Sequence, residues 1–431
     1  MSLKEKINNR KAKVCVIGLG YVGLPMAVEF ARKGFSVAGI DTNPERVGKI
    51  NKGESYVLGI KHEEIKELVS KGKLKAFSRF NVISRLDTVS ICVPTPLRKT
   101  KDPDMSYISS ATNAIKKYIH KDQLIIMEST TYPGTTEELI LPILEESGLE
   151  VGKDFFLAFS PERIDPGNPT YNTRNIPKVV GGVTDECVSL ASLLYEQIMD
   201  SVVTVSSTRV AEMVKLLENT FRSVNIGMVN EIALMCEKLN INVWEVIDAA
   251  KTKPFGFMPF YPGPGIGGHC IPIDPFYLSW KAKMSGFEAR FIDLAGQVNS
   301  TMPHFVVDRI VDALNDVKKS INGSRIHILG VAYKREINDV RESPALDIIN
   351  LLQAKGSTVT YTDPYIQEIN HSEIVSRSKP LSVGLLKKVD CAVIITDHEA
   401  FDYKSIVKNA RLIVDTRNAL RGFKDRHITR L

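Results

Sequence analysis

A glycine-rich turn near the N-terminus constrains the fold more than any other segment. The turn, Gly18-Leu-Gly-Tyr-Val-Gly23, follows the apolar run 13–17 and opens a helical pattern, and the next apolar run ends in Asp41. In such a turn the first glycine allows the tight bend, the second lets the backbone approach a pyrophosphate, and the third lets helix and strand pack closely. The segment predicts a dinucleotide site; a plain tight turn is the alternative.

The acid at the end of the second run bears on which dinucleotide binds. Asp41 lies at the distance expected of a carboxylate that accepts the ribose hydroxyls, and it would repel a 2′-phosphate. Arg46 follows closely and could accept that phosphate, or it could flank the adenine. We expect NAD as the cofactor.

The remaining pattern predicts the architecture. Apolar runs alternate with helical patterns over 13–206 and again from about residue 324, and most runs are apolar on both faces, as parallel strands between helices are. A long helix is predicted over 207–239, where no proline and one glycine occur. The predicted fold class is α/β, with two Rossmann-like doubly wound domains joined by a long helical connector.

We divide the chain into an NAD-binding domain at 1–206, a central helical domain at 207–315 and a second nucleotide-binding domain at 316–431. Two nucleotide folds suggest two bound nucleotides, one in each. Because the 207–239 helix is apolar on several sides, we expect it to build a homodimer.

Composition excludes several classes of protein. The chain has 431 residues, 43% of them hydrophobic and 25% charged, with a net charge of +6 and no basic block that would bind nucleic acid. No apolar run reaches about 18 residues and the N-terminus does not resemble a signal peptide, so we expect a cytoplasmic protein without a membrane partner. No cysteine pair or Cys/His cluster has metal-ligand spacing, so no metal is expected.

One cysteine differs from the other five. Cys270 lies in Gly267-Gly-His-Cys-Ile-Pro-Ile-Asp274 rather than in an apolar run or a helical stretch. Glycines let the chain wrap a ligand, and amide dipoles at the start of a turn or helix lower a thiol pKa. We interpret Cys270 as a nucleophile, with His269 and Asp274 as candidate proton handlers; a structural cysteine is the alternative.

Polar residues follow several predicted strands at the edge where open α/β sheets bind ligands. They are Thr95, Thr130 and Glu162 in the first domain, and Tyr333, Lys334 and Arg341 in the last. The threonines could equally be caps or turn residues, and the Glu162 segment a surface turn. On the long helix Lys215, Asn219 and Arg222 share one face, which would bind an oxyanion or sugar phosphate or simply face solvent.

Seven segments, in this order along the chain, resemble the UDP-glucose/UDP-N-acetylhexosamine 6-dehydrogenases. They are Gly18-Leu-Gly-Tyr-Val-Gly-Leu-Pro25, Cys92-Val-Pro-Thr-Pro96, Glu128-Ser-Thr130, Ser160-Pro-Glu-Arg163, Glu212-Met-Val-Lys-Leu-Leu-Glu-Asn-Thr-Phe221, Gly267-Gly-His-Cys-Ile-Pro-Ile-Asp274, and Gly330-Val-Ala-Tyr-Lys334 with Asp339-Val-Arg-Glu-Ser-Pro344.

The resemblance implies a role for each matching residue. As catalytic residues it implies Cys270, Lys215, Asn219, Asp274, Glu162 and Thr130; as NAD contacts Gly18, Gly20, Tyr21, Val22, Gly23, Asp41, Arg46, Thr95, Thr130 and Arg341; and as substrate contacts Arg163, Ile164, Lys215, Asn219, Arg222, Lys253, Gly267, Tyr333 and Lys334.

It also implies the reaction: a four-electron oxidation of the C6 hydroxyl of a UDP-sugar to the uronic acid, through a thiohemiacetal and a thioester on Cys270, for surface polysaccharide synthesis. The histidine before Cys270 resembles the enzymes of UDP-N-acetylhexosamines, and the segments beginning at Thr130 and Glu162 favour UDP-N-acetylglucosamine. UDP-N-acetylmannosamine and UDP-glucose are the alternatives. A single-step β-hydroxyacid dehydrogenase and a non-enzymatic NAD-responsive protein rank lower.

Overall fold

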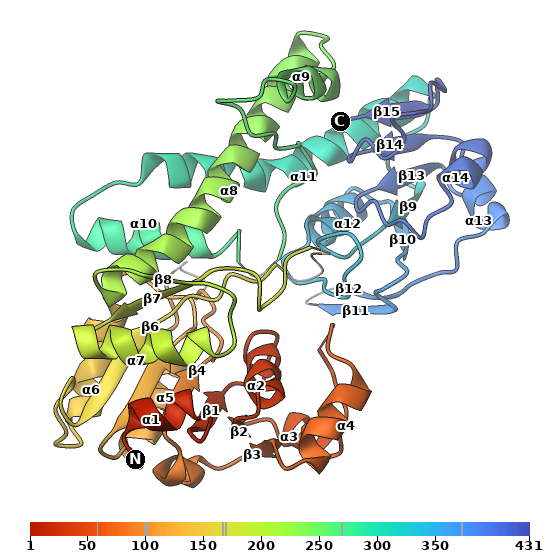
Figure 1. The fold of residues 1–431 in the computed structure, drawn as a ribbon. Helices are drawn as coiled ribbons and strands as arrows, with labels where there is room; N and C mark the ends of the chain where they lie inside the picture. Colours follow the sequence, from red (N-terminus) through yellow and green to blue (C-terminus); the bar gives the residue numbers. More distant parts are fainter. Residues whose placement is uncertain (58, 99–101, 166–167, 169, 269, 372–373) are drawn as a thin grey trace. The chain divides into compact units, whose positions relative to one another are not determined.

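A computed structural model describes residues 1–57, 59–98, 102–165, 168, 170–268, 270–371 and 374–431 of the chain. These residues form two compact units. The first contains Met1–Glu218 and Trp280–Phe287, and the second contains Asn219–Ser279 and Glu288–Leu431. Each unit is built around its own sheet, mostly parallel in the first unit and wholly parallel in the second (Figure 1).

The first unit has an eight-stranded sheet in the order β3-β2-β1-β4-β5-β6-β7-β8. The strands are β1 (Lys13–Ile17), β2 (Ser36–Ile40), β3 (Leu74–Phe77), β4 (Thr88–Ile91), β5 (Gln123–Met127), β6 (Phe155–Phe159), β7 (Lys178–Gly182) and β8 (Val202–Thr204). The first six are mutually parallel, whereas β7 pairs antiparallel with β6 and β8 runs parallel to β7. The last two strands therefore run opposite to the rest.

Both faces of this sheet are covered. In β1, Val14 and Val16 belong to one buried cluster while Cys15 and Ile17 belong to another, because successive side chains of a strand point to opposite faces. The covering helices are α1 (Leu3–Asn8), α2 (Gly23–Arg32), α3 (Pro44–Asn51), α4 (His62–Ser70), α5 (Ser106–Lys116), α6 (Leu141–Glu145) and α7 (Asp185–Glu196), with short helical turns η1 (Phe80–Arg85) and η2 (Thr136–Ile140).

The second unit has a five-stranded parallel sheet in the order β10-β9-β13-β14-β15. Its strands are β9 (Arg325–Leu329), β10 (Thr358–Thr362), β13 (Cys391–Ile394), β14 (Ile413–Asp415) and β15 (Ile428–Arg430), and β11 (Glu368–His371) forms a separate hairpin with β12 (Ile374–Arg377). Its helices include α9 (Val243–Ala250), α12 (Pro344–Ala354), α13 (Val383–Lys388) and α14 (Tyr403–Asn409).

Long helices join the two sheets, as Figure 1 shows. They are α8 (Thr208–Lys238) and α11 (Arg290–Asp316), with α10 (Asp274–Met284) before α11. In the second unit α8 and α11 pack so closely that an added Cβ at Gly227 would lie 3.0 Å from the Cα of Ala295. Only a glycine fits at this position without a shift of the neighbouring backbone. A buried asparagine pair joins the same helices: Asn230 donates to the side chain of Asn299 at 2.9 Å.

The predicted fold class is confirmed: an α/β chain with two such sheets and a long helical connector. The predicted helix over 207–239 is present as α8. Of the predicted strands, β8 pairs parallel with β7 but runs opposite to the first six, and strands β3, β7 and β15 and the β11–β12 hairpin were not expected. These strands are three to five residues long, too short for a periodicity to stand out. The division into three domains stays a prediction.

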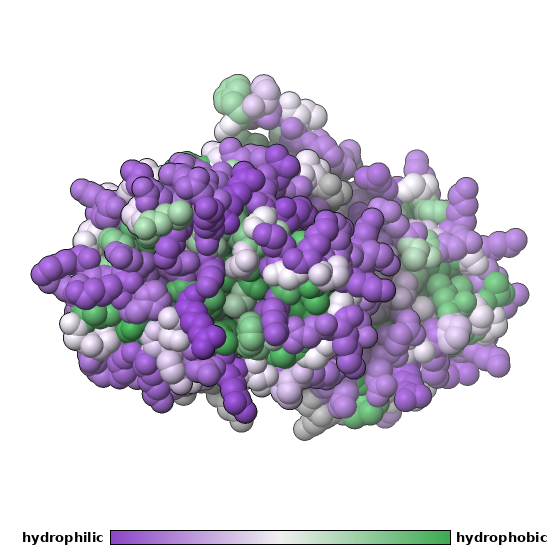
Figure 2. All heavy atoms as spheres, turned by 60° about the horizontal axis from the view of Figure 1, so that its bottom comes forward, coloured by the Kyte–Doolittle hydropathy of each residue, from purple (hydrophilic) through white to green (hydrophobic). Residues whose placement is uncertain are grey.

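Among the residues that the structure describes, no helix is long and apolar enough to cross a membrane. The face drawn in Figure 2 is mostly hydrophilic, with hydrophobic residues in scattered groups.

Candidate functional site

The glycine turn of the first unit is held by Asp41. Gly18 has a φ of +88°, and its N–H donates to the carbonyl of Ile40 at 2.8 Å. The Asp41 carboxylate then accepts from the N–H of Leu19 at 2.9 Å and from the N–H of Asn43 at 2.8 Å. These bonds fix the turn directly before α2, whose first N–H groups lack partners within the helix.

The turn fits a dinucleotide. An added Cβ at Gly20 would have no heavy atom of the described chain within 4 Å, whereas at Gly23 it would lie 1.9 Å from the carbonyl oxygen of Gly18. Gly20 is therefore open where a pyrophosphate would approach the backbone, and Gly23 is required for packing. Tyr21 is exposed and Val22 is the residue before α2, so both adjoin this open position.

Tyr56 is a neighbour of this turn that was not among the predicted site residues. Its hydroxyl donates to the carbonyl of Leu19 at 2.6 Å, and the guanidinium of Arg46 lies 5.8 Å from its ring centre. Arg46 also pairs with Asp41 at 3.4 Å. Asp41 is the acid predicted to bind the ribose, so its ion pair with Arg46 is consistent with the predicted position of Arg46 beside the cofactor. A tyrosine 15 residues beyond the acid gives no signal by spacing.

The predicted strand-end residues lie along one edge of the first sheet. Thr95 follows β4, Thr130 follows β5 and Glu162 follows β6, and these three strands are parallel neighbours. Thr95 is buried and Thr130 is partly exposed. The edge is thus the one at which this fold class binds ligands.

Glu162 is held by backbone amides and by a lysine. Its Oε1 accepts from the N–H groups of Arg163 at 2.8 Å and Ile164 at 2.9 Å, and its Oε2 accepts from Lys178 at 3.3 Å. Burial alone would raise the pKa of Glu162, but Lys178, the two amides and Lys215 outweigh it and hold that pKa below its usual value. Glu162 is therefore an ionised, mostly buried carboxylate.

The two basic residues next to this carboxylate differ in their partners. Lys215, on α8, is 8% exposed and acts on Glu162 electrostatically. Arg163 forms an ion pair with Glu218, also on α8, at 2.6 Å and donates to the carbonyl of Pro177 at 2.7 Å. Arg163 thus ties the segment after β6 to α8; its predicted substrate contact, like that of Ile164, stays a prediction.

In the second unit two predicted catalytic residues are in contact. The side-chain amide of Asn219, on α8, donates to Oδ2 of Asp274 at 2.5 Å. Both side chains are buried, at 5% and 3% exposure, so the acid fixes the orientation of the amide. Arg222, three residues further along α8, is exposed.

Cys270 is an exposed residue just before α10. Its carbonyl accepts from the N–H groups of Ile273 at 3.1 Å and Asp274 at 2.8 Å, which forms the turn into the helix. The predicted place of Cys270 at the start of a turn or helix is confirmed. His269, the other candidate proton handler, lies outside the described residues.

The glycines before Cys270 pack on the loop after β9. An added Cβ at Gly267 would lie 2.7 Å from the Cβ of Tyr333, and one at Gly268 would lie 2.7 Å from the Tyr333 ring. The N–H of Gly268 also donates to the carbonyl of Arg341 at 3.1 Å. Two predicted substrate residues, Gly267 and Tyr333, are therefore in contact, and a side chain at either glycine would separate them.

The other predicted residues of this unit lie as follows. Lys334 is partly exposed beside Tyr333. Arg341 forms an ion pair with Asp339 at 2.6 Å. Lys253 is exposed, with its ammonium 4.9 Å from the centre of the Phe255 ring. The roles expected for these three side chains stay predictions.

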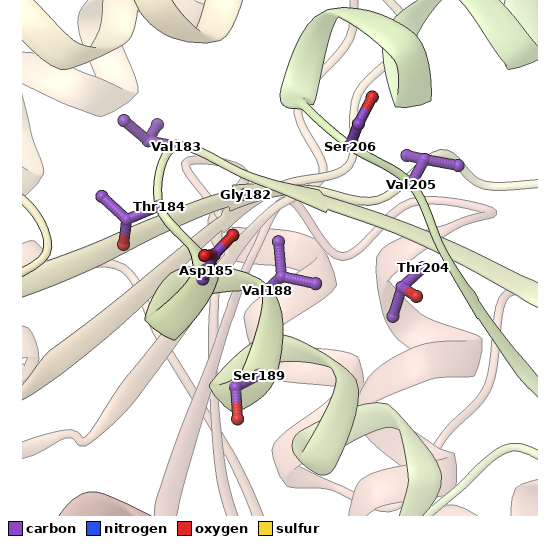
Figure 3. Close-up of a pocket in the computed structure, with 9 residues that line it drawn as sticks. All are labelled: Gly182, Val183, Thr184, Asp185, Val188, Ser189, Thr204, Val205 and Ser206. Atoms are coloured by element: carbon purple, nitrogen blue, oxygen red, sulfur yellow. The ribbon is translucent and has the colours of Figure 1, made fainter.

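A groove of about 480 Å³ in the first unit is lined, among the residues that the structure describes, by none of the predicted site residues. Figure 3 shows its lining side chains, which come from the turn between β7 and α7, from α7, and from the segment of β8 and beyond. Its one charged side chain is Asp185, in the first turn of α7, which does not suit a phosphate or carboxylate ligand.

Comparison with known proteins assigns this arrangement to a family. Profiles of the UDP-glucose/GDP-mannose dehydrogenase family match the chain in three parts: the NAD binding domain at residues 12–199, the central domain at 209–301 and the UDP binding domain at 327–422. The chain belongs to this family. It is an NAD-dependent UDP-sugar 6-dehydrogenase.

Individual relatives differ in substrate. A UDP-N-acetyl-D-mannosamine dehydrogenase of Pyrococcus horikoshii is 36% identical, covering 95% of this chain and 96% of its own length. A UDP-N-acetyl-D-glucosamine 6-dehydrogenase of Pseudomonas aeruginosa is 37% identical, covering 82% of this chain and 83% of its own. The solved UDP-D-ManNAc dehydrogenase of Pyrococcus horikoshii has a TM-score of 0.88 and 34% identity, covering 97% of this chain and 98% of that chain.

Proposed function

We propose that the substrate is a UDP-N-acetylhexosamine, with UDP-N-acetylglucosamine as the first candidate and surface polysaccharide synthesis as the use of the product. The segments that begin at Thr130 and Glu162 favour the glucosamine sugar. UDP-N-acetylmannosamine is the second candidate, because two relatives of that name are 36% and 34% identical to this chain, close to the 37% of the glucosamine enzyme.

The observation that carries the covalent part of the proposal is the contact between the Gly267–Gly268 turn and Tyr333. Cys270 follows this turn by two residues, which supports a position for it near the loop after the first strand of the UDP binding domain. Since open α/β sheets bind ligands at the carboxyl ends of their strands, a UDP-sugar held there would bring its hexose toward the exposed cysteine. Binding energy from the remote UDP would then orient C6.

The residues divide the chemistry between them. Two molecules of NAD, bound one after the other, would each accept one of the two hydrides that the four-electron oxidation releases. The Cys270 thiolate adds to C6 of the aldehyde to give a thiohemiacetal, loss of the second hydride from C6 converts it to a thioester, and water hydrolyses the thioester. Lys215 and Asn219 stabilise the oxyanions, and Asp274 keeps the Asn219 amide in one orientation. Glu162 accepts a proton from the attacking water, with Thr130 as a further polar partner.

We also propose that the enzyme is a homodimer built on α8. Large apolar side chains at 213, 217, 221, 228 and 235 are exposed, and these positions share one face of the helix. Apolar side chains repeated along a helix face are typical of an interface.

A substrate panel tests the function. UDP-N-acetylglucosamine, UDP-N-acetylmannosamine and UDP-glucose are each incubated with NAD, and NADH is counted per sugar consumed. Two NADH from UDP-N-acetylglucosamine, at the highest kcat/KM of the three, is the expected result. A preference for the mannosamine sugar would overturn the substrate, one NADH per sugar would favour single-step oxidation, and none would favour a non-enzymatic NAD-responsive protein.

A further inference from the structure

A lysine is buried between two carboxylates at the ligand edge of the first sheet. The ammonium of Lys178 lies 2.9 Å from Oε2 of Glu128 and 3.3 Å from Oε2 of Glu162. The side chains of Lys178, Glu128 and Glu162 are 4%, 0% and 12% exposed. A lysine is almost never buried to this extent unless it is paired, so the two acids account for its position.

The reversal of strand direction explains how the lysine reaches this edge. Lys178 is the first residue of β7, which pairs antiparallel with β6 through Ala158↔Gly182 and Phe159↔Gly181. The start of β7 therefore lies where β5 and β6 end, which is the edge that carries Glu128 and Glu162. In a wholly parallel sheet the first residue of a strand would lie at the opposite edge.

The hydrogen bonds of the Glu162 carboxylate limit the position at which it could bind a water. Its Oε1 accepts two backbone N–H groups, from Arg163 and Ile164, and its Oε2 accepts from Lys178. A carboxylate oxygen has two lone pairs, so Oε2 keeps one for a water. Lys178 thus helps to determine where a water bound to Glu162 would lie.

Charged and titratable groups face this carboxylate from several elements. They are Lys178 on β7, Glu128 after β5, Lys215 on α8, Cys92 after β4 and, behind Glu128, Tyr195 on α7. Burial and the nearby Glu128 raise the pKa values of Cys92 and Tyr195, so both stay neutral. Burial opposes the charge of Lys178, but Glu128 and Glu162 outweigh it and raise the lysine's pKa. Within the described part of the chain, Lys178 is the cation that forms an ion pair with Glu162.

We propose that Lys178 is a positioning residue for the hydrolytic step: it holds Glu162 in place and ionised, and Glu128 anchors the lysine. The inference rests on the proposed role of Glu162. In that step the water oxygen attacks the thioester carbon and the bond to Sγ of Cys270 breaks. The sulfur leaves with the electron pair, and Glu162 takes a proton from the water and later returns it to solvent.

Two substitutions separate positioning from a merely structural role. Lys178→Met removes the cation and leaves two carboxylates near each other, which should raise the pKa of Glu162. The acid limb of the pH–rate profile for hydrolysis, where the rate falls as Glu162 becomes protonated, should therefore move up by about one pH unit or more. Glu128→Gln keeps an acceptor for Lys178 but leaves Glu162 as the sole negative partner of the lysine, so the limb should stay in place or move down. A purely structural pair would make both variants lose activity alike, without a shift.

Further variants guard against misfolding. Lys178→Arg keeps the charge and should keep the parent's acid limb. If Lys178→Met does not fold, the double variant Lys178→Met with Glu128→Gln removes both charges and should still raise the limb. Asp87→Asn is the matched control, because Asp87 pairs with Lys6 at 2.6 Å before β4, at the opposite edge of the same sheet.

The readout is the decay of the covalent adduct on the Cys270 peptide, followed by quenched-flow mass spectrometry across the acid range. The inference is supported if the acid limb moves up in Lys178→Met, stays or moves down in Glu128→Gln, and matches the parent's in Lys178→Arg. If the acid limbs of Lys178→Met and of the double variant coincide with the parent's, the inference is overturned, while adduct formation by the parent keeps the proposed function intact. No adduct in the parent at any pH overturns the proposed covalent route and the inference with it.

Discussion

Asp363 has the same place in the second sheet that Asp41 has in the first. One oxygen of each carboxylate accepts backbone N–H groups from the turn after the neighbouring strand, from Leu19 at 2.9 Å in one case and from Val331 at 2.7 Å in the other. The other oxygen of each binds the turn after its own strand. Each turn begins with a glycine of positive φ, Gly18 at +88° and Gly330 at +81°.

This similarity predicts that substitution of Asp41 weakens NAD binding and that substitution of Asp363 weakens UDP binding. Asp41→Asn should weaken NAD binding about tenfold to a hundredfold, because an amide nitrogen would face buried N–H groups and the ribose acceptor would be lost. Asp363→Asn should instead disturb the loop that carries Tyr333 and Lys334 and weaken UDP binding by a similar factor. Calorimetric titration of both variants with NAD and with UDP measures both effects.

Each variant serves as the control for the other. Equal losses of both ligands in either variant would mean that the substitution perturbs the whole fold rather than one turn. Faster turnover of the unmutated enzyme with NADP would contradict the role of Asp41 in excluding a 2′-phosphate.

The sequence predicted those parts of the site whose residues are neighbours in the chain. The turn from Gly18 to Gly23 and the segment around Cys270 each combine backbone freedom with chemistry within eight residues. The fold class followed from the alternation of buried strands and helices, because a parallel sheet needs both faces covered. Strand direction did not follow: β7 is five residues long, and its reversal is visible only in its pairing with β6.

The pairing of residues that lie far apart in the chain could not be predicted from the sequence. Lys178 is 50 residues from Glu128 and 16 from Glu162, and Asn219 is 55 from Asp274. A lysine at the start of a short apolar run normally marks a strand end in solvent, so nothing in the spacing indicated burial. The pairing of Asn219 with Asp274 requires α8 and the start of α10 to pack together, which is a property of the tertiary structure.

Substitution of Cys270 should abolish turnover and leave binding intact. A serine hydroxyl is far less ionised than a thiol, and an ester hydrolyses less readily than a thioester, so we expect Cys270→Ser to lower kcat by about a thousandfold or more. NAD and UDP should bind with nearly unchanged affinity. Cys236→Ala, at a buried position of α8, is the control and should keep its activity.

Iodoacetamide should inactivate the enzyme by alkylating Cys270. Cys270 is exposed while the other five cysteines are buried or half-buried, so alkylation should be found by mass spectrometry on the Cys270 peptide and should be slowed by UDP-sugar. Release of the uronic acid by Cys270→Ser at a rate within a few-fold of the parent would instead favour oxidation of an aldehyde hydrate without a covalent intermediate.

The proposed dimer depends on the exposed apolar face of α8. Met228 is 53% exposed on this face, and a charge placed there would be desolvated on association. Met228→Glu should therefore give a monomer by light scattering at micromolar concentration, where the parent should be a dimer. Val375→Glu is the matched control, since Val375 is an apolar residue of β12 that is 73% exposed. A monomeric parent, or equal behaviour of the two variants, would exclude an interface on α8.

Glu212 should make the stability of the first unit fall as the pH rises. This α8 carboxyl is fully buried and accepts hydrogen bonds from the N–H of Gly134 and from the N–H and hydroxyl of Thr136. Burial raises its pKa from 4.5 to about 7 despite those three donors. Between these two values the unfolded chain has released the proton while the folded protein still holds it, so folding becomes less favourable as pH rises through this window.

The effect is large enough to measure against a variant. A shift of this size corresponds to about 3 kcal/mol of stability that is present at the acid end of the window and lost at its upper end. Glu212→Gln cannot ionise and should lack this dependence, although it should be less stable than the parent near pH 5, because its amide nitrogen would face a donor. Calorimetric unfolding of both proteins at about pH 5 and about pH 8 should show the stability gap between them narrowing or reversing at the higher pH. A gap that stays constant across the window would mean that Glu212 is already ionised in the folded protein near pH 5, with its three donors outweighing its burial.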